Sequence, residues 1–163
     1  MKHDSAGWSL VRLIPIILAA VVFAVGSAGV VWAADAAYVS KNLPKSYTGT
    51  FQWHDGGEVQ KVAISIGKVA TSKSGDVVAV GKGQYITSNG TTDILVYMII
   101  LPKNLLVKIF ERDAKGSSSF QVAGSHVGKL SPDLKTIEAV WTSQKDGKKG
   151  DLVLKAAKTN SKK

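Results

Sequence analysis

Cysteine is absent from this chain of 163 residues, and arginine is nearly absent. Without thiols there can be no disulfide, no cysteine nucleophile and no thiolate ligand for a metal. Arg12 and Arg112 are the only arginines, so lysine carries almost all of the positive charge behind the net +9. Because bidentate recognition of phosphates and base edges favours arginine, the composition argues against nucleic-acid binding. This basic chain is better suited to anionic lipid, polysaccharide or an acidic partner protein, since general attraction needs only net charge.

Charged side chains are also missing from one long stretch, Leu13 to Ala34, which follows Lys2 and Arg12. An apolar run behind positive residues is typical of a secretory signal, and about 20 apolar residues also suffice to span a bilayer. Residues 1–33 are therefore predicted to be either a cleaved signal peptide or an N-terminal membrane anchor, with a membrane contact through residues 13–34. By the positive-inside rule, everything after them is exported. The protein is expected to be periplasmic or secreted, or membrane-anchored with its domain outside the cytoplasm.

Polar and apolar residues alternate almost everywhere between residues 47 and 157, with turn residues between the runs. Such alternation is typical of half-buried β-strands. It predicts one domain over 47–157, built from strands at residues 47–54, 58–66, 76–87, 91–101, 105–112, 120–124, 135–143 and 151–157. Ser125 to Leu134 is expected to be a long connection, and no helix is expected after the N-terminal apolar one. Residues 34–46 are predicted to be a tether, and residues 158–163 a disordered basic tail.

Eight short strands with short connections predict an all-β domain, either an antiparallel up-and-down barrel or a two-sheet β-sandwich. We favour the barrel, because Gly81 and Gly83 in the third strand would allow the bends that closure needs. Gly49, Thr50 and Phe51 in the first strand stand where the lipocalin and avidin group of barrels often has a Gly-x-Trp element, and the layout resembles that group. The resemblance carries over no binding residue and implies only that the barrel could enclose a small-molecule cavity.

Catalytic and metal-binding patterns are scarce. Trp53, His54, Asp55 and Glu58 cluster at the first hairpin, and a histidine beside two carboxylates could ligate a metal or act as a general base. A polar hairpin tip is, however, the usual composition of a solvated turn. His126 is the other candidate, but its spacing from His54 matches no zinc motif. We therefore expect no catalytic residue, no metal and no cofactor, which makes the protein a non-enzyme.

The strand at 91–101 is apolar on both faces, which suggests a partner surface. In a barrel one of these faces must point outward, and an exposed apolar patch marks an interaction site. The surface is predicted to comprise Leu95, Tyr97, Ile99, Leu101 and Leu106. The first hypothesis is thus an exported protein-interaction or structural module that self-associates or binds a protein partner, as an accessory subunit at a membrane or cell surface.

Aromatic residues support a second hypothesis, in which the domain is a carrier. A barrel of eight strands has an interior just wide enough for side chains or one small ligand. A small apolar ligand would then lie in a cavity lined by Phe51, Trp53, Tyr85 and Trp141.

Overall fold

A computed structural model describes residues 34–115 and 123–158. The predicted N-terminal helix, the choice between signal peptide and anchor, and nearly all of the predicted basic tail lie outside these residues. Within the described ranges, no helix combines the length and the apolar character needed to cross a membrane.

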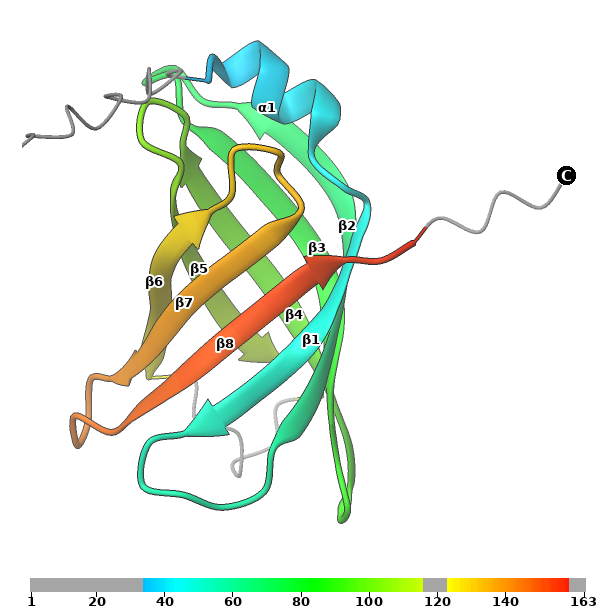
Figure 1. Cartoon of the computed structure of the whole chain (residues 1–163), viewed down its shortest axis with the longest axis vertical. Coiled ribbons are helices and arrows are strands. Elements are labelled where there is room, and N and C mark those ends of the chain that lie inside the picture. Colours follow the sequence, from blue (N-terminus) through cyan, green and yellow to red (C-terminus); the bar gives the residue numbers. More distant parts are fainter. Residues whose placement is uncertain (1–33, 116–122, 159–163) are drawn as a thin grey trace, which may run out of the picture. The chain divides into compact units, whose positions relative to one another are not determined.

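The described chain folds into a closed antiparallel barrel in which each strand pairs with the next and β8 pairs with β1 (Figure 1). Its strands are β1 (Ser46–Trp53), β2 (Gln60–Thr71), β3 (Val77–Thr87), β4 (Gly90–Leu101), β5 (Leu106–Asp113), β6 (Gly124–Leu130), β7 (Thr136–Ser143) and β8 (Lys149–Ala156). The prediction of an all-β, eight-stranded up-and-down barrel is confirmed, and the sandwich alternative is wrong. Inward-facing apolar side chains form one continuous core.

The sixth strand differs from its prediction. It comprises Gly124–Leu130, so most of the expected long connection is strand, and residues 120–122 of the predicted strand lie outside the described residues. Gly124 and Gly128 occupy inward-facing positions, where a Cβ would overlap the Trp141 ring and the backbone of β7 respectively. Since glycine replaces apolar residues at these two positions, the alternation that marks a half-buried strand is hidden in the sequence.

One short helix, α1 (Ala36–Asn42), lies over one end of the barrel (Figure 1). Asp35 caps it, because its side chain accepts a hydrogen bond of 2.6 Å from the backbone N–H of Tyr38. Val39 and Leu43 are buried and belong to the barrel core. The expectation of no helix after the N-terminal segment is therefore wrong, and part of the predicted tether packs on the barrel. A helix of seven residues is too short to produce a clear periodic pattern.

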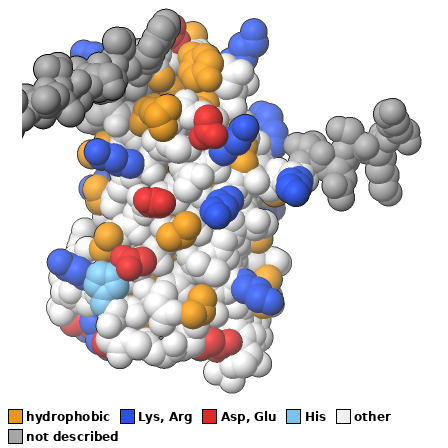
Figure 2. Space-filling model, viewed as in Figure 1, with side chains coloured by type: hydrophobic (Ala, Val, Ile, Leu, Met, Phe, Trp, Pro, Cys, Tyr) orange, Lys and Arg blue, Asp and Glu red, His pale blue; other side chains and the backbone are white. Residues whose placement is uncertain are grey.

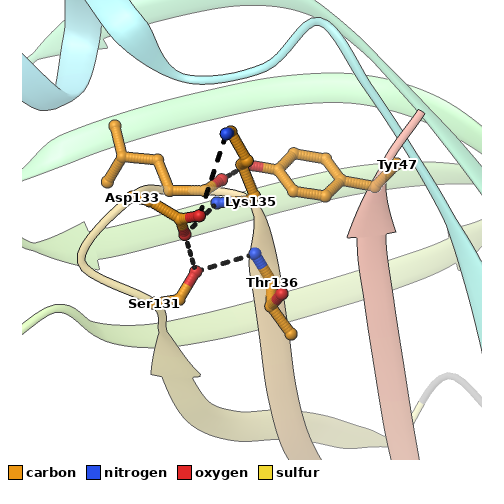
Figure 3. Close-up of polar contacts among 6 residues, drawn as sticks. Tyr47, Ser131, Asp133, Lys135 and Thr136 are labelled. Carbon is orange, nitrogen blue, oxygen red and sulfur yellow. Dashed lines mark hydrogen bonds and ion pairs between the residues drawn. The ribbon is translucent and has the colours of Figure 1, made fainter. Parts of the chain in front are cut away.

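A buried tyrosine ties β1 to the turn between β6 and β7 at the same end (Figure 3). The Tyr47 hydroxyl donates a hydrogen bond of 2.7 Å to the Leu134 carbonyl oxygen. Ser131 fixes the turn, since its hydroxyl donates to Asp133 at 2.6 Å and accepts from the Thr136 N–H at 2.8 Å. The pKa of Tyr47 is raised, mainly by burial and further by the negative charge of Asp133. Tyr47 therefore stays a neutral donor across the whole physiological range.

Candidate functional site

Two features could carry function: a cluster of aromatic and polar side chains inside the barrel, and an apolar patch on its outer surface. The interior cluster lies toward the end remote from α1. Phe51 and Trp53 are near the far end of β1, and Tyr85 and Trp141 are near the far ends of β3 and β7. The structure thus brings the four predicted cavity residues together.

The rings of this interior cluster pack edge to face. Phe51 lies 4.9 Å from Trp53 and 5.9 Å from Tyr85, measured between ring centroids, and Trp53 lies 5.2 Å from Trp141. Gly150 makes room for the Phe51 ring, because a Cβ at this position would overlap it. Edge-to-face packing of this kind stabilises a core beyond the apolar area it buries. These three ring contacts therefore link the four side chains into one cluster.

Buried polar groups adjoin these rings. The Tyr85 hydroxyl lies 3.0 Å from each carboxylate oxygen of Glu111 and donates to that carboxylate. His126, 1% exposed, has its Nε2 3.2 Å from a Glu111 oxygen, which is an ion-pair distance without hydrogen-bond alignment. Neither ring nitrogen of His126 has a hydrogen-bond partner among the described residues. Burial, followed by the Glu111 charge and hydrogen bond, raises the pKa of Tyr85 well above its ordinary value.

Sequence reasoning missed Glu111 as a member of this cluster and placed His126 in a connection. The sequence did contain a signal for Glu111. It follows Val107 and Ile109 at intervals of two residues, which places all three on the same face of the strand. For His126 the flanking glycines of β6 concealed the strand itself. Both residues occupy inward positions, where a charged side chain is unusual.

The polar residues of the first hairpin are dispersed among different partners. His54 Nε2 lies 2.7 Å from an Asp151 oxygen, in a pair whose side chains are 46% and 58% exposed. Asp55 pairs with Lys148 at 3.3 Å, and Glu58 accepts hydrogen bonds from Ser88. Over residues 34–115 and 123–158, no group of three or more histidine or acidic side chains is arranged to hold a metal ion. These contacts join the turns at the end of the barrel remote from α1.

The outer patch crosses β3, β4 and β5. Leu95 is 44% exposed and Tyr97 42% exposed, whereas the other predicted surface residues, Ile99, Leu101 and Leu106, are partly exposed. Tyr97 stands between Val80 of β3 and Phe110 of β5 in the strand register. We define the β3–β5 face as the outward-facing apolar side chains of Val78, Val80, Leu95, Tyr97, Ile99, Leu101, Leu106 and Phe110.

Positive charges surround the β3–β5 face. Lys82 and Arg112 flank Leu95 in register, and Lys68 lies beside Val80. Lys108 stands next to Ile99, with its ammonium 4.9 Å from the centre of the Phe110 ring. Within the described part of the chain, none of these four cations forms an ion pair. The opposite side of the barrel looks different, with apolar side chains scattered among charges of both signs (Figure 2).

No family model, curated protein or solved structure matches this chain. An eight-stranded up-and-down barrel does not by itself specify a function.

Proposed function

We propose that this chain is an exported, non-catalytic binding module that docks onto a partner surface through the β3–β5 face. The observation that carries the proposal is the exposure of Tyr97 between Val80 and Phe110, in an apolar surface that crosses three strands and has the exposed Leu95 at its edge. Soluble monomers seldom present large apolar patches, and those that do commonly use them for binding. An aromatic side chain in such a patch is a frequent anchor of an interface.

The opposite side of the barrel supplies a contrast within the same molecule. Val140 on β7 is 38% exposed, and its register neighbours are Val127 on β6, 45% exposed, and Asp151 on β8. A pair of exposed apolar residues beside a charge is ordinary on protein surfaces. The β3–β5 face differs because its apolar residues adjoin one another across three strands.

Docking can be tested by the accessibility of introduced cysteines, since the natural chain has none to interfere. Leu95→Cys and, as the matched control, Val140→Cys are reacted with a thiol reagent in the cells that produce the protein and after purification. We expect position 95 to react more slowly in the cell than when purified, and position 140 to react equally in both. Equal accessibility of position 95 in both settings contradicts the proposal.

A second function, the binding of a small ligand inside the barrel, is favoured by one observation. The buried ring nitrogens of His126 form no aligned hydrogen bond with any described residue, and the imidazole lies 5.9 Å from the Phe51 ring, measured between centroids. A ligand with both an apolar body and a polar group could satisfy such a site. Titration with hydrophobic ligands tests it through Trp53 and Trp141 fluorescence. Absence of quenching with every ligand counts against a carrier.

A further inference from the structure

We infer that the partner of the β3–β5 face is the surface of an anionic lipid bilayer. This inference rests on the proposed docking through that face and assigns the chemistry of the partner. The apolar side chains would enter the boundary between headgroups and acyl chains, and Lys68, Lys82, Lys108 and Arg112 would meet the lipid phosphates. A surface with apolar residues at its centre and cations around it is typical of peripheral membrane binding.

Charge argues against a second copy of this chain as the partner. In a symmetric dimer the same patch faces itself, so the four cations of one copy would lie against those of the other. Like charges facing each other across an interface oppose association. The nearest acidic side chain on the outer face of these strands, Asp93, is already engaged: it lies 3.5 Å from Lys115 and accepts a 2.9 Å hydrogen bond from Gln84. An anionic surface is therefore the complementary partner.

The side chains within the face suit an interface between water and hydrocarbon. Tyr97 and Phe110 lie side by side, with ring centroids 6.2 Å apart. The Tyr97 ring carries a polar hydroxyl, and aromatic rings of this kind are favoured at headgroup depth. The Lys108 ammonium lies over the Phe110 ring. Its aliphatic stem can thus cover apolar surface while its charged end reaches the headgroups.

A hollow beside the apolar centre offers space for a headgroup. It measures about 390 Å³ and is lined by Gly67, Lys68, Val80, Gly81, Lys82 and Leu95, among others. The β2 strand bulges at Gly67, between Ile66 and Lys68. Gly67 contributes no side chain to the hollow, so backbone lies open between two lysines. A phosphate there would face two cations from one side and apolar carbon from the other.

To test this inference, a polarity-sensitive dye is attached to the cysteine of full-length Leu95→Cys. The labelled protein is mixed with vesicles of phosphatidylcholine, either alone or with phosphatidylglycerol, and the emission of the dye is measured. We expect a blue shift of the dye only with the anionic vesicles, weakened by salt because the attraction is screened. Lys68→Gln combined with Lys82→Gln should weaken binding roughly 30-fold, since each cation near an anionic bilayer contributes about a factor of five. The matched charge control is Lys61→Gln with Lys155→Gln, on strands β2 and β8, which should bind nearly as wild type.

The same dye on Val140→Cys separates the face from the N-terminal segment. Residues 1–33 precede both labelled positions equally, so a shift shared by the two positions reports on that segment and contradicts the inference. No shift at position 95, or an equal shift with neutral vesicles, also overturns it. If the cysteine at position 95 reacts slowly in cells but its dye shows no shift with anionic vesicles, docking holds and the partner is a protein. If the thiol at position 95 reacts more slowly as the protein concentration rises, with no vesicles present, the partner is a second copy of the chain.

Discussion

Tyr47 makes a single polar contact that spans the barrel, from β1 to the turn after β6. Its hydroxyl is buried and 2.7 Å from the Leu134 carbonyl oxygen. Tyr47→Phe leaves that carbonyl without its donor, and we expect a loss of about 1–2 kcal/mol in the free energy of unfolding. Urea unfolding measures it. Tyr38→Phe, at a side chain 47% exposed, is the control and should leave the midpoint unchanged. Equal midpoints for the two variants would show that the Tyr47 bond contributes nothing net.

The Glu111 carboxylate accepts a hydrogen bond from Tyr85 and lies beside His126 in a largely apolar interior. Removing it therefore affects both of these neighbours. Glu111→Leu leaves the Tyr85 hydroxyl and the imidazole buried without the carboxylate, and should cost about 3 kcal/mol of stability. Adding Tyr85→Phe and His126→Leu removes the stranded polar groups as well. We expect the triple variant to recover most of the loss, because apolar replacement of a whole buried network is often neutral.

The comparison of single and triple variants in urea also bears on why the network is there. A triple variant less stable than Glu111→Leu alone contradicts this account and means that the remaining polar groups stabilise the fold. Recovered stability agrees with it and leaves the network free for another role, such as contact with a ligand.

At the residue scale, alternation in the sequence predicted which side chains share a face, but not what they touch. It placed Phe51 and Tyr85 on inward positions and Leu95 and Tyr97 on an outward one. It could not show that Phe51 meets Trp53 and Tyr85 edge to face, because those contacts depend on how the strands are staggered around the barrel. Burial of Glu111 ran against the usual preference of charged residues for water, and composition alone favoured exposure.

Among the elements, β6 depends most on glycine. Gly124 lies under the Trp141 ring, so Gly124→Ala should displace the indole and cost about 1–3 kcal/mol of stability through overpacking. Trp141 fluorescence should change at the same time. Ser125→Ala, the next residue and outward-facing, is the control. Wild-type stability and an unchanged emission spectrum in Gly124→Ala would mean that the ring is not held against this glycine.

Elements with a clear strand pattern, either alternating or continuously apolar, were predicted from the sequence, and those without such a pattern were not. The apolar strand at 91–101 corresponds closely to β4, and its two faces point as predicted. β6 was misplaced because inward glycines serve close approach rather than apolar burial. Helix α1 was missed because Val39 and Leu43 are too few to define a helical face, and both are buried in the core of the barrel.

For the whole molecule, closure depends on the pairing of β1 with β8, at opposite ends of the domain sequence. No local pattern predicts this pairing, which is why a sandwich and a barrel were both compatible with the sequence. Closure also defines the surface, since it leaves one face of every strand outward and none of the edges free. Within the described residues, the outward face of β4 is accordingly exposed at Leu95 and Tyr97.

Alkaline pH should unfold the whole barrel through its two buried tyrosines. Burial raises the pKa of both Tyr47 and Tyr85 above the ordinary value, so the unfolded chain loses these protons first. A group whose pKa is higher in the folded state contributes its full stability below the unfolded-state pKa, and loses it as the pH rises toward the folded-state value. We therefore expect the thermal midpoint to fall steeply above about pH 10, where tyrosine ionises in an unfolded chain.

The double variant Tyr47→Phe with Tyr85→Phe isolates this effect from the deprotonation of lysines, which both proteins share. The variant should melt at a lower temperature near neutral pH, because the buried hydrogen bonds are lost, but its midpoint should fall less between about pH 9 and 11. The two curves should therefore converge as the pH rises. Parallel curves would mean that ionisation of the buried tyrosines does not limit the stability of the barrel, and that alkaline unfolding arises from the lysines alone.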